Sequence, residues 1–498
     1  MNFQSPLRVL MVASEVAPYA KTGGLADVIG SLPAALTARG LDVRVVLPRY
    51  DSISSGQFPA RVVGHIEIAF DGATQTAQLL QVDAAQTPVA TYFIDAPQYF
   101  CRRRLYGESD DVLRFGFFSR VAVELPRVLG WHSHIIHCHD WHSGLVPAYC
   151  RSSPNSWRVE DDTRCRAKTV FTIHNLAYQG LAHKDFLPRL GLDWSLFNTQ
   201  GLEFYDQINP MKAALVWSDA VTTVSPQYAR EVQTPEFGAG LDGVLRTRSA
   251  AISGILNGID YNKWNPGTDC VIAANYSSED MRGKAACRRD LLHHLRLPND
   301  STKPIIGMVS RLSSQKGFDL VAQAMEPMLK MGFQFVLLGT GDQRYERAFE
   351  DLARRFPQSV VAKLGVFNDD LAHRIYAGSD FFLMPSRYEP CGLGQMIALA
   401  YGTIPIVRAT GGLVDSVREF DPAQGQGNGF TFAEFSAEAM LHALHRARCC
   451  FHSPQWPRLL QNALECDFSW DLSAAQYESL YRRVLGMSRS NTQLALEA

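Results

Sequence analysis

The sequence predicts an α/β protein made of two doubly wound lobes that face a cleft between them. Short apolar runs alternate with helical patterns along most of the 498 residues, which is typical of parallel sheets with helices on both faces. A stretch rich in glycine and polar residues, within 238–264, interrupts the alternation and is the expected linker. A Thr-Gly-Gly-Leu-x-Asp motif occurs once in each half, at residues 22–27 and 410–415.

The predicted strands divide into two sets. The strands of the first lobe are Leu7–Ala13, Val43–Leu47, Val89–Ile94, Ile135–His137, Thr169–Ile173 and Ala220–Val224. Those of the second lobe are Ile305–Val309, Phe335–Leu338, Val360–Leu364, Phe381–Met384 and Ile404–Val407. We therefore expect domains at 1–250 and 251–470, followed by a last helix and a polar tail at 471–498.

Composition excludes several classes of protein. The 48 Lys and Arg against 50 Asp and Glu give a formal charge of −2, without a long basic run, which argues against nucleic-acid or polybasic membrane binding. No segment approaches the roughly 18 apolar residues of a membrane span. The ten cysteines show no repeated Cys-x-x-Cys spacing, so we expect reduced thiols in a cytoplasmic protein.

The first glycine motif follows a predicted strand and opens a helical pattern. Adjacent glycines Gly23 and Gly24 let the backbone approach a ligand, and the start of the helix offers N–H groups and a positive dipole end to a phosphate. Lys21 adds a mobile positive charge. A tight turn with a solvated lysine is the alternative interpretation.

Two further segments carry charge directly after predicted strands of the second lobe. Arg311 and Lys316 follow Ile305–Val309, and Glu389 lies in the segment 385–395 that follows Phe381–Met384. Ligands of open α/β sheets bind beyond the carboxyl ends of the strands, where both segments are expected. Solvated loop residues are the alternative.

Together with His139-Asp140-Trp141-His142, residues 172–180 and residues 256–260, these segments resemble bacterial glycogen synthases and the catalytic part of plant starch synthases, over nearly the whole chain. The resemblance implies a GT-B fold of two Rossmann-like lobes, with a terminal helix that crosses back to the first. It also implies that glucose is transferred from ADP-glucose to the non-reducing end of an α-1,4-glucan such as glycogen. Configuration would be retained and ADP released, without a cofactor.

The resemblance also implies roles for individual residues. Arg311 and Lys316 would bind the diphosphate, Glu389 and His139 would lie at the donor glucose, and Asp110 would help at the sugar or the acceptor. The other expected substrate-binding residues are Lys21, Gly23, Gly24, Asp27, Tyr106, Asn257, Gly341, Phe367, Cys391, Gly392 and Leu393.

Several of these positions have ordinary alternatives. His139 could be a core histidine, Asp110 a helix N-cap, and Phe367, expected to stack on adenine where the family usually has tyrosine, a core aromatic. The chain also departs from the pattern. Ile397 stands where many related enzymes carry a second glutamate, which argues against a mechanism that needs that acid, and Gly394 replaces the more usual threonine.

Five histidines lie within eleven residues, at 132, 134, 137, 139 and 142. Such a cluster suggests a metal, but side chains alternate between faces along a strand and cannot all converge, so we expect no metal site.

Four other functions compete with the one implied by the resemblance. The same transfer could use UDP-glucose, or the protein could be a catalytically idle glucan-binding protein, against which the intact Lys21, Arg311, Lys316 and Glu389 argue. A dehydrogenase is disfavoured because neither lobe has Gly-x-Gly-x-x-Gly after its first strand. A phosphorylase would need pyridoxal phosphate, whose lysine no feature identifies.

Overall fold

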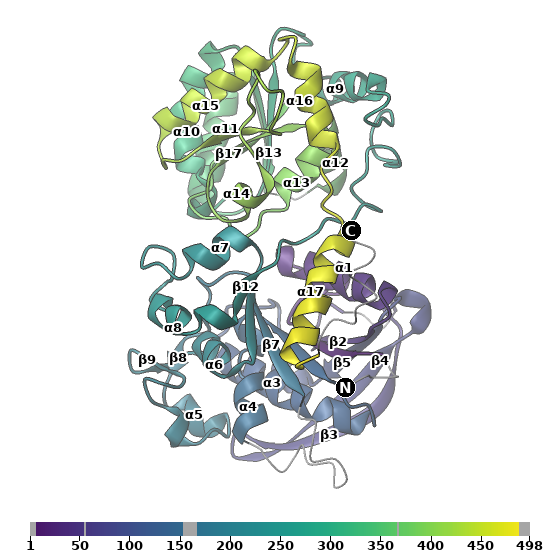
Figure 1. Cartoon of the computed structure of the whole chain (residues 1–498), viewed down its shortest axis with the longest axis vertical. Coiled ribbons are helices and arrows are strands. Elements are labelled where there is room, and N and C mark those ends of the chain that lie inside the picture. The colour runs from purple at the N-terminus through teal and green to yellow at the C-terminus, as the bar shows by residue number, and fades with distance from the viewer. Residues whose placement is uncertain (1–5, 54–55, 153–166, 366–367, 488–498) are drawn as a thin grey trace. The chain divides into compact units, whose positions relative to one another are not determined.

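The computed structural model describes residues 6–53, 56–152, 167–365 and 368–487. The chain forms two compact units, each with its own sheet (Figure 1). The first unit comprises Met1–Val224, Ala229–Gly258 and Trp470–Ala498, and the second comprises Ser225–Tyr228 and Ile259–Ser469. Much of the predicted linker is ordered structure of the first unit, since α8 (Asp242–Thr247) and β12 (Ile252–Gly254) belong to it.

The first unit contains a nine-stranded sheet in the order β12-β11-β7-β6-β1-β2-β5-β4-β3. Its strands are β1 (Arg8–Val12), β2 (Asp42–Pro48), β3 (Ala60–Phe70), β4 (Ala73–Val82), β5 (Ala90–Asp95), β6 (Ile135–His139), β7 (Lys168–Ile173), β11 (Ala220–Thr223) and β12. β1 lies between β6 and β2, and it runs parallel to both. The chain moves outward from β1 in opposite directions on the two sides, so β1 and β6 flank a topological switch point.

The expectation of a wholly parallel sheet is wrong at one edge. β3 pairs antiparallel with β4, and β4 pairs antiparallel with β5. Asp71 and Gly72 connect β3 to β4 with φ angles of 52° and 73°, the backbone of a two-residue hairpin turn. Such a short connection permits only antiparallel strands, because a parallel pair needs a long crossover.

The helices of the first unit include α1 and α17, which lie side by side (Figure 1). Among the described residues, the α-helices that lie wholly in this unit are α1 (Gly24–Ala38), α2 (Pro97–Phe100), α3 (Asp111–Val128), α4 (Val146–Ser152), α5 (Phe186–Arg189), α6 (Pro210–Trp217), α8 and α17 (Trp470–Val484). α1 buries Val28, Ile29, Leu32 and Leu36, which recur at helical spacing. A small sheet of β8 (Ala182–His183), β10 (Gln207–Ile208) and β9 (Glu203–Phe204) completes the unit.

The terminal helix α17 is fixed to the first unit by polar contacts. Arg39 at the end of α1 donates to Glu478 at 2.9 Å and to Asp471 at 3.2 Å. The Tyr481 hydroxyl lies 2.8 Å from Nδ1 of His137 on the central strand β6, and both residues are fully buried. Helix α17 therefore contacts the strand that ends at His139.

The second unit contains a six-stranded parallel sheet in the order β15-β14-β13-β16-β17-β18. Its strands are β13 (Ile305–Val309), β14 (Gln334–Gly339), β15 (Val360–Leu364), β16 (Phe381–Met384), β17 (Ile404–Arg408) and β18 (Phe430–Phe432). Its helices are α9 (Arg282–Leu295), α10 (Phe318–Lys330), α11 (Gln343–Arg355), α12 (Asp369–Gly378), α13 (Gly394–Ala400), α14 (Gly412–Ser416), α15 (Ala437–Cys450) and α16 (Trp456–Leu464). α7 (Pro226–Glu231) begins in residues of the second unit and ends in residues of the first. β13 and β16 flank the switch point of this sheet.

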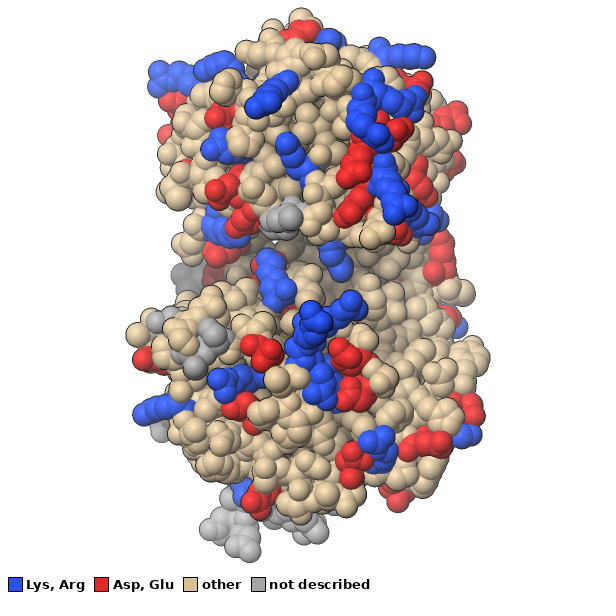
Figure 2. All heavy atoms as spheres, turned by 180° about the vertical axis from the view of Figure 1, so that it is seen from behind, with Lys and Arg blue, Asp and Glu red and all other residues tan. Residues whose placement is uncertain are grey.

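The surface carries both signs of charge, and basic and acidic side chains are intermixed on the face seen in Figure 2. Within the described ranges, none of the helices combines the length and apolar character that a bilayer crossing requires. The nine cysteines in the described part of the chain are all free.

Tyr481→Phe should lower the free energy of unfolding by about 1 kcal/mol, because it removes one buried hydrogen bond and leaves His137 without that partner. Tyr205→Phe is the matched control, since Tyr205 is 79% exposed and should change stability little. Urea denaturation of both variants measures the difference. Equal stability of the two variants would contradict a stabilising role for the Tyr481 contact.

Candidate active site

Two of the three charged residues predicted in the second unit, Lys316 and Glu389, meet at its switch point. Lys316 Nζ lies 2.9 and 2.7 Å from the two carboxylate oxygens of Glu389, and the Ser386 hydroxyl donates to the same carboxylate at 2.9 Å. Glu389 is only 5% exposed. The structure thus brings together a buried acid from the loop after β16 and a cation from the loop after β13.

The second glycine motif holds the Glu389 loop in place. Gly411 has a φ of 47°, and a Cβ atom there would lie 1.9 Å from the Glu389 carbonyl oxygen. Gly412 donates its backbone N–H to that oxygen at 3.0 Å and begins α14, as Gly24 begins α1 in the first copy. Only glycine permits this approach, so the motif at 410–415 supports the Glu389 loop.

The remaining predicted residues of the second unit surround these loops. Arg311 is exposed and has no ion pair within the described residues, which leaves its guanidinium available to an anion. Gly341, after β14, forms a bridge with Leu312 and thereby supports the Arg311 loop. The predicted substrate contacts at Cys391, Gly392 and Leu393 lie between Glu389 and α13, with Cys391 buried and Gly392 at a φ of 73°.

In the first unit, His139 at the end of β6 meets a residue from the end of β7. Its Nδ1 atom lies 3.0 Å from Nε2 of His174. Asp140 follows with a φ of 56°, an unfavourable value for a residue with a side chain, and its carboxylate accepts hydrogen bonds from the backbone N–H groups of His174 and Asn175 at 2.8 and 3.3 Å. The Asp140 carboxylate therefore connects the ends of β6 and β7.

Burial sets the protonation of this group. It lowers the pKa of His174 to about 3 and holds the pKa of His139 well below its usual value. It raises the pKa of Asp140 to about 7, although the two backbone hydrogen bonds oppose the rise. Shifts of this size in the pKa values of buried side chains at the ends of strands are typical of functional sites.

The first glycine motif is also organised by a carboxylate. Glu15, after β1, accepts hydrogen bonds from the backbone N–H groups of Thr22 and Gly23, from the Thr22 hydroxyl and from the Tyr106 hydroxyl. A Cβ atom at Gly23 would have no neighbour within 4 Å, so the loop is open at that point. Lys21 pairs with Asp27 at 2.6 Å and is half exposed.

Two of the remaining predicted residues, Asp110 and Asn257, make none of the contacts described above. Asp110 stands at the N-cap of α3, but its side chain makes no cap hydrogen bond and pairs with Arg102 at 3.3 Å. Asn257 is buried, and its Oδ1 atom has no hydrogen-bond partner within the described residues. Phe367 lies outside the described residues.

Two of the five clustered histidines lie together, since the ring centroids of His137 and His139 are 4.1 Å apart. His137 lies between Tyr481 and the Thr172 hydroxyl, whereas the ring of His142 stacks on Tyr106 with centroids 4.4 Å apart. Burial lowers the pKa of both His137 and His142 to about 3. In the part of the chain that the structure describes, no group of three or more His, Cys, Asp or Glu side chains is arranged to hold a metal ion.

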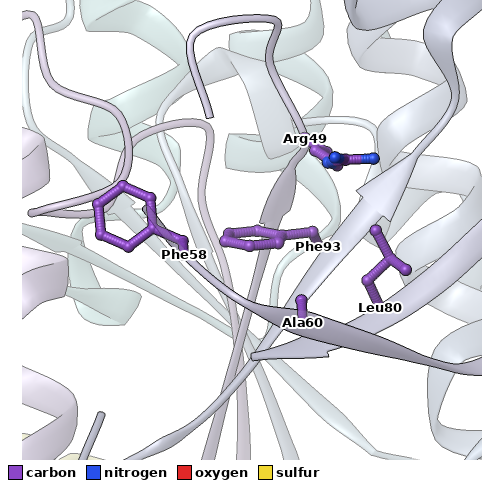
Figure 3. Close-up of a pocket in the computed structure, with 5 residues that line it drawn as sticks. All are labelled: Arg49, Phe58, Ala60, Leu80 and Phe93. Carbon is purple, nitrogen blue, oxygen red and sulfur yellow. The ribbon is translucent and has the colours of Figure 1, made fainter. Parts of the chain in front are cut away.

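A small pocket of about 70 Å³ opens in the first unit, beside β3, β4 and β5 (Figure 3). It is lined by Arg49, Phe58, Ala60, Leu80 and Phe93. Its volume is far below the roughly 300–1,000 Å³ of ordinary ligand pockets, and none of the predicted site residues lines it.

Sequence reasoning missed Glu15, Asp140 and His174 as individual site residues. Asp140 and His174 lie in two motifs that directly follow strands, which was a usable signal. Glu15 belongs to no motif and is identified only by its four hydrogen bonds.

Comparison with known families assigns a class to each part of the chain. Residues 8–247 match the starch synthase catalytic domain, and residues 293–447 match group 1 glycosyl transferases. The described fold, with charged loops at the switch points of two α/β sheets, is that of a GT-B glycosyltransferase.

Full-length relatives narrow the class further. The chain is 47% identical to a glycogen synthase of Anaeromyxobacter sp. (strain Fw109-5), covering 96% of this chain and 99% of the relative. It is 46% identical to a glycogen synthase of Syntrophotalea carbinolica over the same shares. The catalytic domain of starch synthase IV from Arabidopsis thaliana, bound to ADP and acarbose, matches with a TM-score of 0.89 and 38% identity, covering 97% of this chain and 100% of that one. The chain therefore belongs to the glycogen synthase and starch synthase family.

Gly411→Ala should displace the Glu389 loop, because the new Cβ atom would overlap the Glu389 carbonyl oxygen. We expect glucosyl transfer to fall by roughly tenfold or more. Gly40→Ala is the control: Gly40 also has a positive φ, of 88°, but a Cβ atom there meets nothing within 4 Å. It should cost about 1 kcal/mol of stability and leave activity intact. Similar activity of the two variants would contradict the supporting role of Gly411.

The protein should lose stability as pH falls from 7 to 5. His137, His142 and His174 have folded-state pKa values of about 3, so the unfolded chain binds more protons below its ordinary histidine pKa of 6.5. Each contributes a slope of up to roughly 1.4 kcal/mol per pH unit. Asp140 opposes them, since its raised pKa favours the folded state at low pH and that contribution is lost as pH rises through about 7. Three histidines outweigh one aspartate. Denaturant unfolding at several pH values measures the slope, and stability that rises towards pH 5 would contradict it.

Proposed function

We propose that the protein transfers glucose from ADP-glucose to the non-reducing end of an α-1,4-glucan, with retention of configuration and release of ADP. The observation that carries the proposal is the match over 97% of this chain to a starch synthase domain bound to ADP and acarbose. The position of Arg311, Lys316 and Glu389 at a switch point supports it, because nucleotide ligands of α/β sheets bind there.

In the proposed reaction, the bond between the anomeric carbon and the phosphate oxygen breaks while the acceptor hydroxyl bonds to that carbon and passes its proton to the departing phosphate oxygen. Negative charge develops on the departing diphosphate. Arg311 and Lys316 stabilise it, and fixed cations of this kind act most strongly in the transition state. Glu389 supports the positive charge that develops at the anomeric centre.

The first unit supplies the remaining proposed groups. His139 lies beside the donor sugar, and Lys21, Gly23 and Gly24 bind the phosphate of the donor or the end of the growing chain. Asp27 holds Lys21, and Tyr106 and Asn257 contact substrate. Asp110 acts at the sugar or the acceptor. In the second unit, Phe367 stacks on the base.

Arg311→Ala should lower kcat/KM by about 100-fold, corresponding to roughly 2.7 kcal/mol of lost transition-state stabilisation. The exposed side chain can be removed without damage to the core. Nucleotide release from ADP-glucose and from UDP-glucose, each with and without glycogen, measures both the loss and the donor preference. Arg354→Ala, on the exposed surface of α11, is the control and should be silent.

Three results would contradict the proposal. Normal turnover by Arg311→Ala would remove that residue from the diphosphate site. Faster nucleotide release from UDP-glucose than from ADP-glucose would make UDP-glucose the donor. Absence of release from either donor would favour a glucan-binding protein without catalytic activity.

A further inference from the structure

Glu15 fixes the loop that carries the first glycine motif. The sequence predicted no role for this residue. Glu15 is 4% exposed. Its Oε2 atom accepts from the backbone N–H of Thr22 at 2.5 Å and of Gly23 at 3.1 Å. Its Oε1 atom accepts from the Thr22 hydroxyl at 2.7 Å and the Tyr106 hydroxyl at 2.8 Å. One carboxylate therefore joins the loop to the side chain of Tyr106.

The partners of this carboxylate are all neutral. No Lys, Arg or His within the described ranges lies at ion-pair distance from Glu15, so its compensation comes from four hydrogen-bond donors. Hydrogen bonds to a carboxylate are about twice as strong as neutral ones, and a buried carboxylate that lost them would be costly. The loop and Tyr106 are consequently held in one arrangement.

This arrangement decides which groups of the loop can meet a ligand. Glu15 occupies the amides of Thr22 and Gly23, which are therefore not available to a phosphate. Within the described residues, the next amides, of Gly24 and Leu25, have no acceptor and stand at the positive end of the 15-residue helix α1. Lys21, on the other side of Thr22, is half exposed.

We propose that Glu15 is a positioning residue, which holds the Lys21–Gly24 loop and Tyr106 in the geometry that binds substrate. The inference rests on the proposed glucosyl transfer. Because Glu15 fixes the loop rather than contacting the reacting atoms, its removal should weaken the binding of the substrate that the loop contacts and so raise the KM for that substrate.

Glutamine and alanine at position 15 separate this role from general destabilisation. The oxygen of a glutamine amide can accept from the Thr22 and Gly23 amides while its NH₂ group donates to the two hydroxyls, which can accept as well as donate. Alanine removes the acceptor of all four donors, and of these the Tyr106 hydroxyl keeps a contact with the Ser14 hydroxyl at 2.8 Å. Glu15→Gln should therefore retain the loop, and Glu15→Ala should release it.

The experiment measures KM and kcat for ADP-glucose and for glycogen with the full-length protein. Glu15→Ala should raise one of the two KM values by roughly tenfold or more, and Glu15→Gln should stay within about threefold of the unchanged protein. The substrate whose KM changes is the ligand of the loop. If Glu15→Ala does not fold, Glu15→Asp replaces it, since a side chain shorter by one methylene cannot reach both the loop and Tyr106.

Glu124→Gln is the matched control. Glu124 is a similarly buried carboxylate of the first unit, paired with Arg120 and Arg127 on α3, and its substitution should change neither KM. A merely structural role for Glu15 would lower the amount of active protein and leave both KM values unchanged. That result, or equal damage by alanine and glutamine, would overturn the inference.

Two different results distinguish failure of the positioning role of Glu15 from failure of the proposed function. If the unchanged protein releases no nucleotide with glycogen, the proposed function fails. Hydrogen–deuterium exchange then still decides whether Glu15 holds the loop, because the Thr22 and Gly23 amides should exchange faster in Glu15→Ala than in Glu15→Gln. Equal exchange in the two variants would overturn the positioning role.

Discussion

The contact between Lys316 and Glu389 organises the candidate site of the second unit. The Lys316 and Glu389 side chains are 18% and 7% exposed, so both charges are largely removed from water. Loss of one partner would leave the other charge buried and uncompensated, which is costly. The pair joins the loops after β13 and β16, and Gly411 and Gly412 fix the same glutamate loop from the other side through its backbone. A diphosphate bound by Lys316 would share this cation with Glu389, which couples the charge of the leaving group to the acid proposed to face the glucose.

The first unit holds its buried carboxylates in place by other interactions. Its carboxylates, Glu15 and Asp140, are held chiefly by backbone N–H groups and hydroxyls, and its buried histidines are neutral because burial lowers their pKa values. These hydrogen bonds fix the Glu15 and Asp140 side chains, and neither side chain has an ion pair within the described residues.

The sequence predicted much of this because parallel strands are continuous apolar runs and their carboxyl ends collect functional residues. β13, β15 and β16 begin and end at the predicted residues, and Lys316 and Glu389 meet as a switch point requires. The antiparallel β3–β4 hairpin was missed although Asp71-Gly72 is a hairpin signal. Glu15 could not be found from sequence, because its importance lies in hydrogen bonds to residues 7, 8 and 91 positions away. The role of Phe367 stays a prediction, as do the substrate contacts assigned to the other site residues.

The most direct test of the proposed chemistry is to follow the anomeric proton by NMR while the protein acts on ADP-glucose and a short α-1,4-glucan. We expect each new linkage to appear with the α configuration, at the non-reducing end, together with one molecule of ADP. Formation of β-linked product, or release of ADP with free glucose and no chain extension, would contradict the proposed chemistry.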